Sequence, residues 1–275
     1  MPLTRRAGFT LIEVLTSVVL SGLIGLVLVR ATLSLQRVAR ANQESATLQL
    51  AFDGALGFLA TELAQAGHGS AGDDLLRISP DSLSYRGIRG VGLACRVDAN
   101  GVTIPANRLQ SVRLPQPGRD SLLLYVGVDS VTVVRGGWLA LPLTAVGSAS
   151  CAGSPALRLT TVIDTVTTPL ASLPALPPVR IFEVMQARLY PSLGSWWLGA
   201  RSESAGEPIQ PLAGPFVSAG SPFGYLDSLQ QPTLVPAAVE GIRVALLGRW
   251  SGWPGVASPR ADSAHRILST RNLSP

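Results

Sequence analysis

Residues 5–29 read RRAGFTLIEVLTSVVLSGLIGLVLV, an apolar stretch that follows two arginines and contains a single acidic residue, Glu13. From Phe9 to Val29, 14 of the 21 residues are Phe, Leu, Ile or Val. A helix of this length crosses a hydrocarbon core of about 30 Å. The free energy gained when these side chains move from water into lipid is larger than the roughly 3 kcal/mol that one charged group at the helix centre costs. The stretch therefore predicts a membrane-spanning helix over residues 9–29.

Basic residues set the expected orientation of this helix. Arg5 and Arg6 precede it, and no lysine or arginine lies within it. Short segments rich in positive charge stay on the cytoplasmic side of a membrane. We therefore expect a cytoplasmic N-terminus, with the chain beyond residue 30 on the other side. Arg30, Arg37 and Arg40 follow the apolar stretch and act against this orientation.

The sequence RRAG followed by FTLIEVL resembles the leader and cleavage site of type IV prepilins. The resemblance implies that residues 1–8 are a leader, that a prepilin peptidase cuts after Gly8, and that the new amine of Phe9 is methylated. It also implies that Glu13 is the acid used in subunit assembly. An unpaired carboxylate in lipid is costly, so an amine from a neighbouring subunit would neutralise it and favour the correct register. The alternative is an ordinary signal anchor in which Glu13 snorkels or is protonated.

A second apolar pattern extends the helix beyond the membrane. Five large apolar residues are spaced three or four positions apart, which places them on one helix face: Leu48, Phe52, Leu56, Leu59 and Leu63. The residues between them are polar and are expected to face water: Gln43, Glu44, Gln49, Asp53 and Glu62. Gly67 and Gly69 are expected to end the helix. The first half of this helix, predicted over 9–66, must be covered by lipid or other subunits, and the second half by its own domain.

Beyond Gly69 the pattern changes to short apolar or alternating runs that are typical of strands. The clearest runs cover residues 120–128, 130–134, 157–166 and 179–189. Turn residues such as Asn100–Gly101 and Pro117–Gly118 separate the runs. Residues 191–225 are rich in proline and glycine and predict an irregular insertion. The expected fold class is α+β, in which a long helix within residues 9–67 packs on a mainly antiparallel β-sheet head formed by 68–275.

The helix end and the C-terminal third carry a second resemblance. The segments are FLATELAQAGHG (58–69), PFGYLDSLQQP (222–232), AVEGIRVALLGR (238–249) and HRILSTRNLSP (265–275). They are similar to PilW-like minor pilins and to the J-type pseudopilins of type II secretion. PilW-like chains commonly have a cysteine soon after the helix. In this chain His68 and Gly69 follow the predicted helix, and the first cysteine is Cys95.

This resemblance implies a non-enzymatic minor pilin that acts in filament priming or at the tip of a type IV pilus. Its implied location is the inner membrane, as a single-pass protein, and then an extracytoplasmic filament in the periplasm or at the cell surface. The implied partners are the prepilin peptidase, major and minor pilins or pseudopilins, and an inner-membrane assembly platform. A J-type pseudopilin of type II secretion is the alternative, because both systems use the chemistry of Phe9 and Glu13.

Cys95 and Cys151 are the two cysteines of the chain. In an exported domain an even number of cysteines indicates a disulfide, and closing this long loop stabilises a fold by about 4 kcal/mol on the chain-entropy model. Two buried reduced thiols are the alternative. Neither cysteine has the spacing of a metal-binding or redox motif.

The sequence lacks motifs for catalysis, nucleotide binding or metal binding. The two histidines, His68 and His265, belong to no HExxH pattern, and no GxSxG, P-loop or GxGxxG motif is present. Asp73 and Asp74 could contribute to a calcium loop, but an adjacent solvated pair is the simpler interpretation. The net charge of +5, which becomes +3 without the leader, includes no basic run for nucleic-acid recognition. We therefore expect no enzymatic activity, no cofactor and no metal.

Tryptophans in glycine-rich contexts are the candidate contact residues of the head. Trp196 and Trp197 form one pair, and Trp250 and Trp253 flank Gly252. If exposed, they could bind a ligand or a partner, which would make the head a tip adhesin or a DNA- or surface-binding module. The alternative is that they pack as a small satellite core. Trp138 lies in a strand-like run and is expected in the core.

Overall fold

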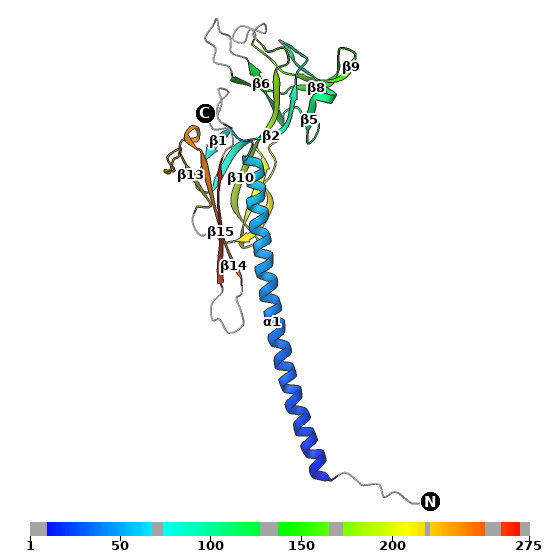
Figure 1. Ribbon diagram of the computed structural model, residues 1–275, viewed down its shortest axis with the longest axis vertical. Helices are drawn as coiled ribbons and strands as arrows, with labels where there is room; N and C mark the ends of the chain where they lie inside the picture. Colours follow the sequence, from blue (N-terminus) through cyan, green and yellow to red (C-terminus); the bar gives the residue numbers. More distant parts are fainter. Residues whose placement is uncertain are drawn as a thin grey trace, which may run out of the picture. The chain divides into compact units, whose positions relative to one another are not determined.

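The computed structural model describes residues 10–67, 74–126, 137–164, 173–217, 221–250 and 260–269. Within these ranges a long N-terminal helix, α1 (Leu11–Leu63), is followed by antiparallel β-sheets (Figure 1). The strands are β1 (Leu75–Ile78), β2 (Ser82–Leu93), β3 (Arg96–Asp98), β4 (Gly101–Pro105), β5 (Leu109–Ser111), β6 (Asp120–Val126), β7 (Gly137–Pro142), β8 (Ala145–Cys151), β9 (Ser154–Thr160), β10 (Pro178–Ser192), β11 (Ser195–Ser202), β12 (Gln210–Phe216), β13 (Phe223–Leu226), β14 (Gly241–Trp250) and β15 (Arg260–Ser269). Two 3-10 turns, η1 (Ala106–Arg108) and η3 (Pro236–Ala238), connect strands. The α+β architecture predicted from the sequence is confirmed.

The chain divides into two compact units. One consists of residues 1–49 and 249–261, and the other of residues 50–248 and 262–275. Helix α1 belongs to the first unit up to residue 49 and to the second over residues 50–63. The second unit, which contains most of the strands, is called the head below.

The apolar stripe predicted for the second half of α1 is buried. Its five members are at most 9% exposed: Leu48, Phe52, Leu56, Leu59 and Leu63. Within the head, the ring of Phe52 stacks on Phe216 of β12, with ring centroids 5.6 Å apart and an interplanar angle of 8°. Burial of one face against strands is therefore what stabilises this part of α1.

Strand β10 is the centre of the largest sheet (Figure 1). One edge pairs with β2 along residues 178–188, and the other pairs with β6 along 179–183 and then with β11 along 185–192. The sheet runs in the order β1-β2-β10-β11-β12, with β5 on β2, β6 on β10 and β7 on β6. Both edges of β10 are paired, so the strand is internal to the sheet. Because successive side chains of a strand point to opposite faces, β10 contributes buried residues to both faces of the sheet.

Two smaller sheets complete the described strands, in the orders β3-β4-β9-β8 and β13-β14-β15. The main core lies between the four-stranded sheet and the β2–β10–β6 region. It consists of Ala94, Val102, Ile104, Leu122, Leu124, Leu141, Leu143, Leu159, Ile163, Val179 and Ile181. Gly101 permits this approach, because its φ is +145° and a Cβ there would collide with the carbonyl oxygen of Leu159.

The strand predictions were accurate at some positions and wrong at others. The run predicted at 120–128 is a strand to Val126, and the run at 179–189 extends over Pro178–Ser192. The run at 157–166 is shorter than predicted and ends at Thr160, and residues 130–134 lie outside the described residues. The irregular insertion predicted for 191–225 is wrong, because this interval supplies β11, β12 and most of β13.

Candidate functional site

The first half of α1 presents an apolar surface with no protein covering it. It is the one helix in the described part of the chain that is long and apolar enough to cross a membrane, and its most apolar 18-residue window is 0% buried. Thirteen large apolar side chains between residues 11 and 29 are exposed, from Leu11 at 83% to Val14 at 49%. Exposed apolar surface of this extent is compatible with lipid or with packing against other helices, consistent with a single-pass anchor.

Glu13 lies in the first turn of α1 and forms a capping box with Thr10. The Thr10 N–H and hydroxyl donate to Glu13 Oε2 at 3.3 and 3.2 Å, and the Glu13 N–H donates to Thr10 Oγ1 at 3.4 Å. This arrangement satisfies two amide groups that a helix start otherwise leaves unpaired. Glu13 Oε1 accepts no hydrogen bond from any of the described residues. This role of Glu13 was not predicted from the sequence, although the pattern Thr-x-x-Glu is the usual signature of a capping box. Gly8 and Phe9 lie outside the described residues.

The opposite end of α1 is attached to the sheet through Glu62. The Arg89 guanidinium of β2 donates to both Glu62 oxygens at 3.1 Å, and the Tyr85 hydroxyl donates to Oε2 at 3.2 Å. Burial and the nearby Glu62 charge raise the pKa of Tyr85 well above its ordinary value. The prediction that Glu62 faces water is wrong, because its side chain is 17% exposed and fully engaged.

Glu183 of β10 is the centre of a buried charged cluster. Its carboxylate accepts hydrogen bonds from Arg89 Nε and Arg119 Nε, each at 2.6 Å. It also accepts one from Arg113 Nη2 at 3.1 Å and one from Ser202 Oγ at 3.3 Å. Burial raises the pKa of Glu183, but the bonds and charges of Arg89 and Arg119 outweigh that effect and leave it below the ordinary value.

The charged cluster extends along the loop that precedes β6. Arg113 makes a bidentate pair with Asp120 at 2.6 and 2.7 Å, the Gln116 N–H donates to Asp120 at 2.7 Å, and Arg119 also pairs with Glu207. The complete cluster consists of Glu62, Arg89, Arg113, Arg119, Asp120, Glu183 and Glu207. Each acid in it is paired with at least one arginine, so the cluster fastens the helix end and three strands together.

Asp74, directly before β1, is buried. Its carboxylate accepts the Gly67 N–H at 3.0 Å and lies 3.5 Å from Arg86 Nη1. Burial raises the pKa of Asp74, although the Gly67 hydrogen bond and the Arg86 charge oppose this shift. The interpretation of Asp74 as a solvated residue is therefore wrong. Its neighbour Asp73 and His68 lie outside the described residues.

The two cysteines are joined. Cys95, directly before β3, forms a disulfide with Cys151 at the end of β8, with their Cα atoms 6.3 Å apart. The disulfide interpretation is confirmed over that of two reduced thiols. Among the described residues, no group of three or more His, Cys, Asp or Glu is placed to hold a metal ion.

Three of the candidate contact tryptophans, Trp196, Trp197 and Trp250, lie on strands. Trp196 and Trp197 are half-buried on β11, where they pair with Pro191 and Tyr190 of β10, and a Cβ on Gly214 would touch the Trp197 ring. Trp250 ends β14 and is 8% exposed. These three residues therefore belong to strands and not to exposed loops, despite their glycine-rich sequence contexts. Trp253 lies outside the described residues.

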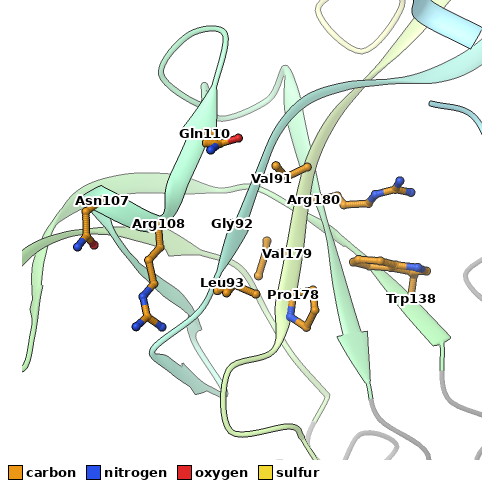
Figure 2. Close-up of a pocket in the computed structure, with 10 residues that line it drawn as sticks. All are labelled: Val91, Gly92, Leu93, Asn107, Arg108, Gln110, Trp138, Pro178, Val179 and Arg180. Atoms are coloured by element: carbon orange, nitrogen blue, oxygen red, sulfur yellow. The ribbon is translucent and has the colours of Figure 1, made fainter. Parts of the chain in front are cut away.

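A cavity of about 340 Å³ lies beside a different tryptophan, Trp138 of β7 (Figure 2). Its apolar floor consists of Val91 and Leu93 from β2 with Pro178 and Val179 from β10. Figure 2 shows Asn107 and Arg108 on one side of this floor, and Arg180 and Trp138 on the other. Gln110 of β5 and the backbone of Gly92 complete the lining. The prediction of Trp138 as a core residue is only partly correct, because its ring packs on Tyr125 and Arg180 but also borders this cavity.

No family model, curated protein or solved structure matched this chain.

Proposed function

We propose that this chain is a minor pilin: a non-enzymatic subunit that is stored in the inner membrane and packed by its N-terminal helix into a type IV pilus. The observation that supports this most directly is that one continuous helix has two burial environments. The apolar window near its start is 0% buried, whereas Leu59 and Leu63 near its end are at most 1% exposed. A helix built in this way holds a head at one end and offers the other end to lipid or to neighbouring helices.

The chemistry of assembly is assigned to Gly8, Phe9 and Glu13. Cleavage after Gly8 would create an amine at Phe9, directly before Thr10, the first residue of the capping box that Glu13 closes. Glu13 Oε2 is occupied by Thr10, so Oε1 remains for an amine from the preceding subunit. Such a pair would remove the cost of a carboxylate in an apolar environment and fix the axial register of the subunits.

The size of the head supports a minor position. A head with three sheets would crowd a lattice that repeats along the whole filament, whereas it can be accommodated at a tip or in a priming complex. This step rests on analogy with the pilin family.

The test is complementation of a deletion strain with Glu13→Ala and with Gly8→Ser. Val18→Ala is the matched control, because Val18 is 66% exposed on the same apolar helix and carries no charge. We expect Glu13→Ala to leave the strain without filaments, Gly8→Ser to retain the leader on immunoblots, and Val18→Ala to restore filaments. Wild-type complementation by both Glu13→Ala and Gly8→Ser would contradict the proposal.

A J-type pseudopilin of type II secretion is the second candidate, favoured by the same helix. The same deletion strain distinguishes the two functions. Loss of surface filaments and of filament-dependent behaviour supports a pilus subunit. Intact filaments with retention of secreted enzymes in the periplasm would assign the chain to secretion instead.

A further inference from the structure

We propose that the cavity lined by Arg108 on one side and Arg180 on the other binds an acidic saccharide and recognises its carboxylates through these two arginines. The cavity is defined by Val91, Gly92, Leu93, Asn107, Arg108, Gln110, Trp138, Pro178, Val179 and Arg180 (Figure 2). It lies wholly within the head, far in sequence from the assembly residues of α1. The proposal goes beyond the proposed function, because filament assembly does not need it.

The charge of the lining selects the ligand. Two arginines line the cavity and no acidic residue does. Arg108 is exposed, and its side chain makes no hydrogen bond or ion pair with the part of the chain that the structure describes. An arginine with no acidic partner beside an apolar surface is complementary to an anion.

Arg180 is held in place from two sides. Its guanidinium carbon lies 5.2 Å from the ring centroid of Trp138, and Nη1 lies 4.0 Å from Asp74 Oδ2. Asp74 is bound more closely by the Gly67 amide, at 3.0 Å, so it neutralises Arg180 only in part. The planar guanidinium is thus oriented before binding, with donors left for a planar carboxylate, which arginine binds in a bidentate manner.

The remaining lining favours a saccharide over other anions. Asn107 and Gln110 each offer a donor and an acceptor, which matches hydroxyl groups that both give and accept hydrogen bonds. Val91 and Leu93 are 43% and 39% exposed and form, with Pro178, an apolar floor suited to the C–H face of a sugar ring. The volume of about 340 Å³ is at the lower end of the range of about 300–1,000 Å³ for ligand pockets, so we expect a short segment to bind.

The test measures binding of oligogalacturonate to the full-length protein in detergent by isothermal titration calorimetry. The fully methyl-esterified oligosaccharide is the matched probe, because it keeps the rings and removes the charge. We expect the ester, Arg108→Gln and Arg180→Gln each to weaken binding at least tenfold. Arg188→Gln should bind as the wild type does, because Arg188 is exposed on β10 but does not line the cavity. Binding should also weaken as salt increases.

Four results would overturn the proposal: no binding of oligogalacturonate, equal binding of the ester, unchanged binding by Arg108→Gln, or tighter binding of a polyglutamate peptide. The last result would identify the occupant as an acidic peptide. Since Arg108 is exposed, its variant decides the question even if Arg180→Gln fails to fold. Glu13→Ala should bind the saccharide normally, so failure of the assembly proposal and failure of this one are distinguishable.

Discussion

At the residue scale, folding shifts the pKa values of two buried carboxylates of the head, Glu183 and Asp74, in opposite directions. Glu183 receives hydrogen bonds from three arginines, and its pKa is lowered despite burial. Asp74 receives fewer, and burial raises its pKa. Folding therefore favours the ionised form of Glu183, whereas it shifts the equilibrium of Asp74 toward the protonated form.

We predict that Glu183→Gln lowers the free energy of unfolding of the head by about 3–5 kcal/mol at neutral pH, because it leaves several buried arginine donors without a charged partner. Glu240→Gln is the control, since Glu240 is half-buried and its side chain has no hydrogen bond or ion pair with the described residues; its effect should stay within about 0.5 kcal/mol. Thermal unfolding followed by near-ultraviolet circular dichroism measures both.

The effect of Glu183→Gln should also depend on pH. A carboxyl whose pKa is lowered by folding contributes stability above its unfolded pKa, and this contribution disappears as the pH falls through the folded pKa. The difference between the wild type and Glu183→Gln should therefore be full at pH 7 and shrink below about pH 4. A difference that remains constant from pH 7 to pH 3 would show that the loss arises from packing and not from charge.

At the scale of elements, α1 should depend on its buried stripe more than on its exposed leucines. Leu59 is 0% exposed, whereas Leu50 is 72% exposed on the same helix. We predict that Leu59→Ala destabilises the head by about 2–5 kcal/mol, because it leaves a cavity in the interface between helix and sheet. Leu50→Ala should change stability by less than about 0.5 kcal/mol. Equal losses in urea unfolding would argue against docking through one face.

The elements that the sequence predicted are those whose signal is local. The stripe in α1 follows the helical period and was predicted. The spacing of Thr10 and Glu13 was not interpreted as a capping box, although it too is a local signal. Strands β11 and β12 were missed because glycine and proline interrupt them. They form because β10 supplies a long partner for β11, and β12 tolerates Pro211 and Pro215 since it ends the strand order.

At the scale of the whole molecule, what could not be predicted is non-local. Arg119 and Glu183 are 64 residues apart in sequence, and Arg89 and Glu183 are 94 apart. The charged cluster and the Arg108–Arg180 cavity exist only because β2, β6 and β10 become neighbours, and no spacing in the sequence encodes that pairing. The positions of the tryptophans are non-local in the same way, because strand pairing places Trp196 and Trp197 beside β10 and brings Trp138 to a cavity.

The disulfide acts at this same scale, because it joins the two outer strands of the four-stranded sheet. Cys95 precedes β3 and Cys151 ends β8, at a sequence separation of 56. Closing a loop of this length restricts the unfolded chain by about 4 kcal/mol on the chain-entropy model. We predict that reduction lowers the Tm of the head by roughly 10 °C. The Cys95→Ser/Cys151→Ser variant should have the lower Tm with or without reductant, which separates loss of the crosslink from other effects of the reagent. An unchanged Tm on complete reduction, verified by thiol titration, would mean that strand pairing and core packing alone stabilise this sheet.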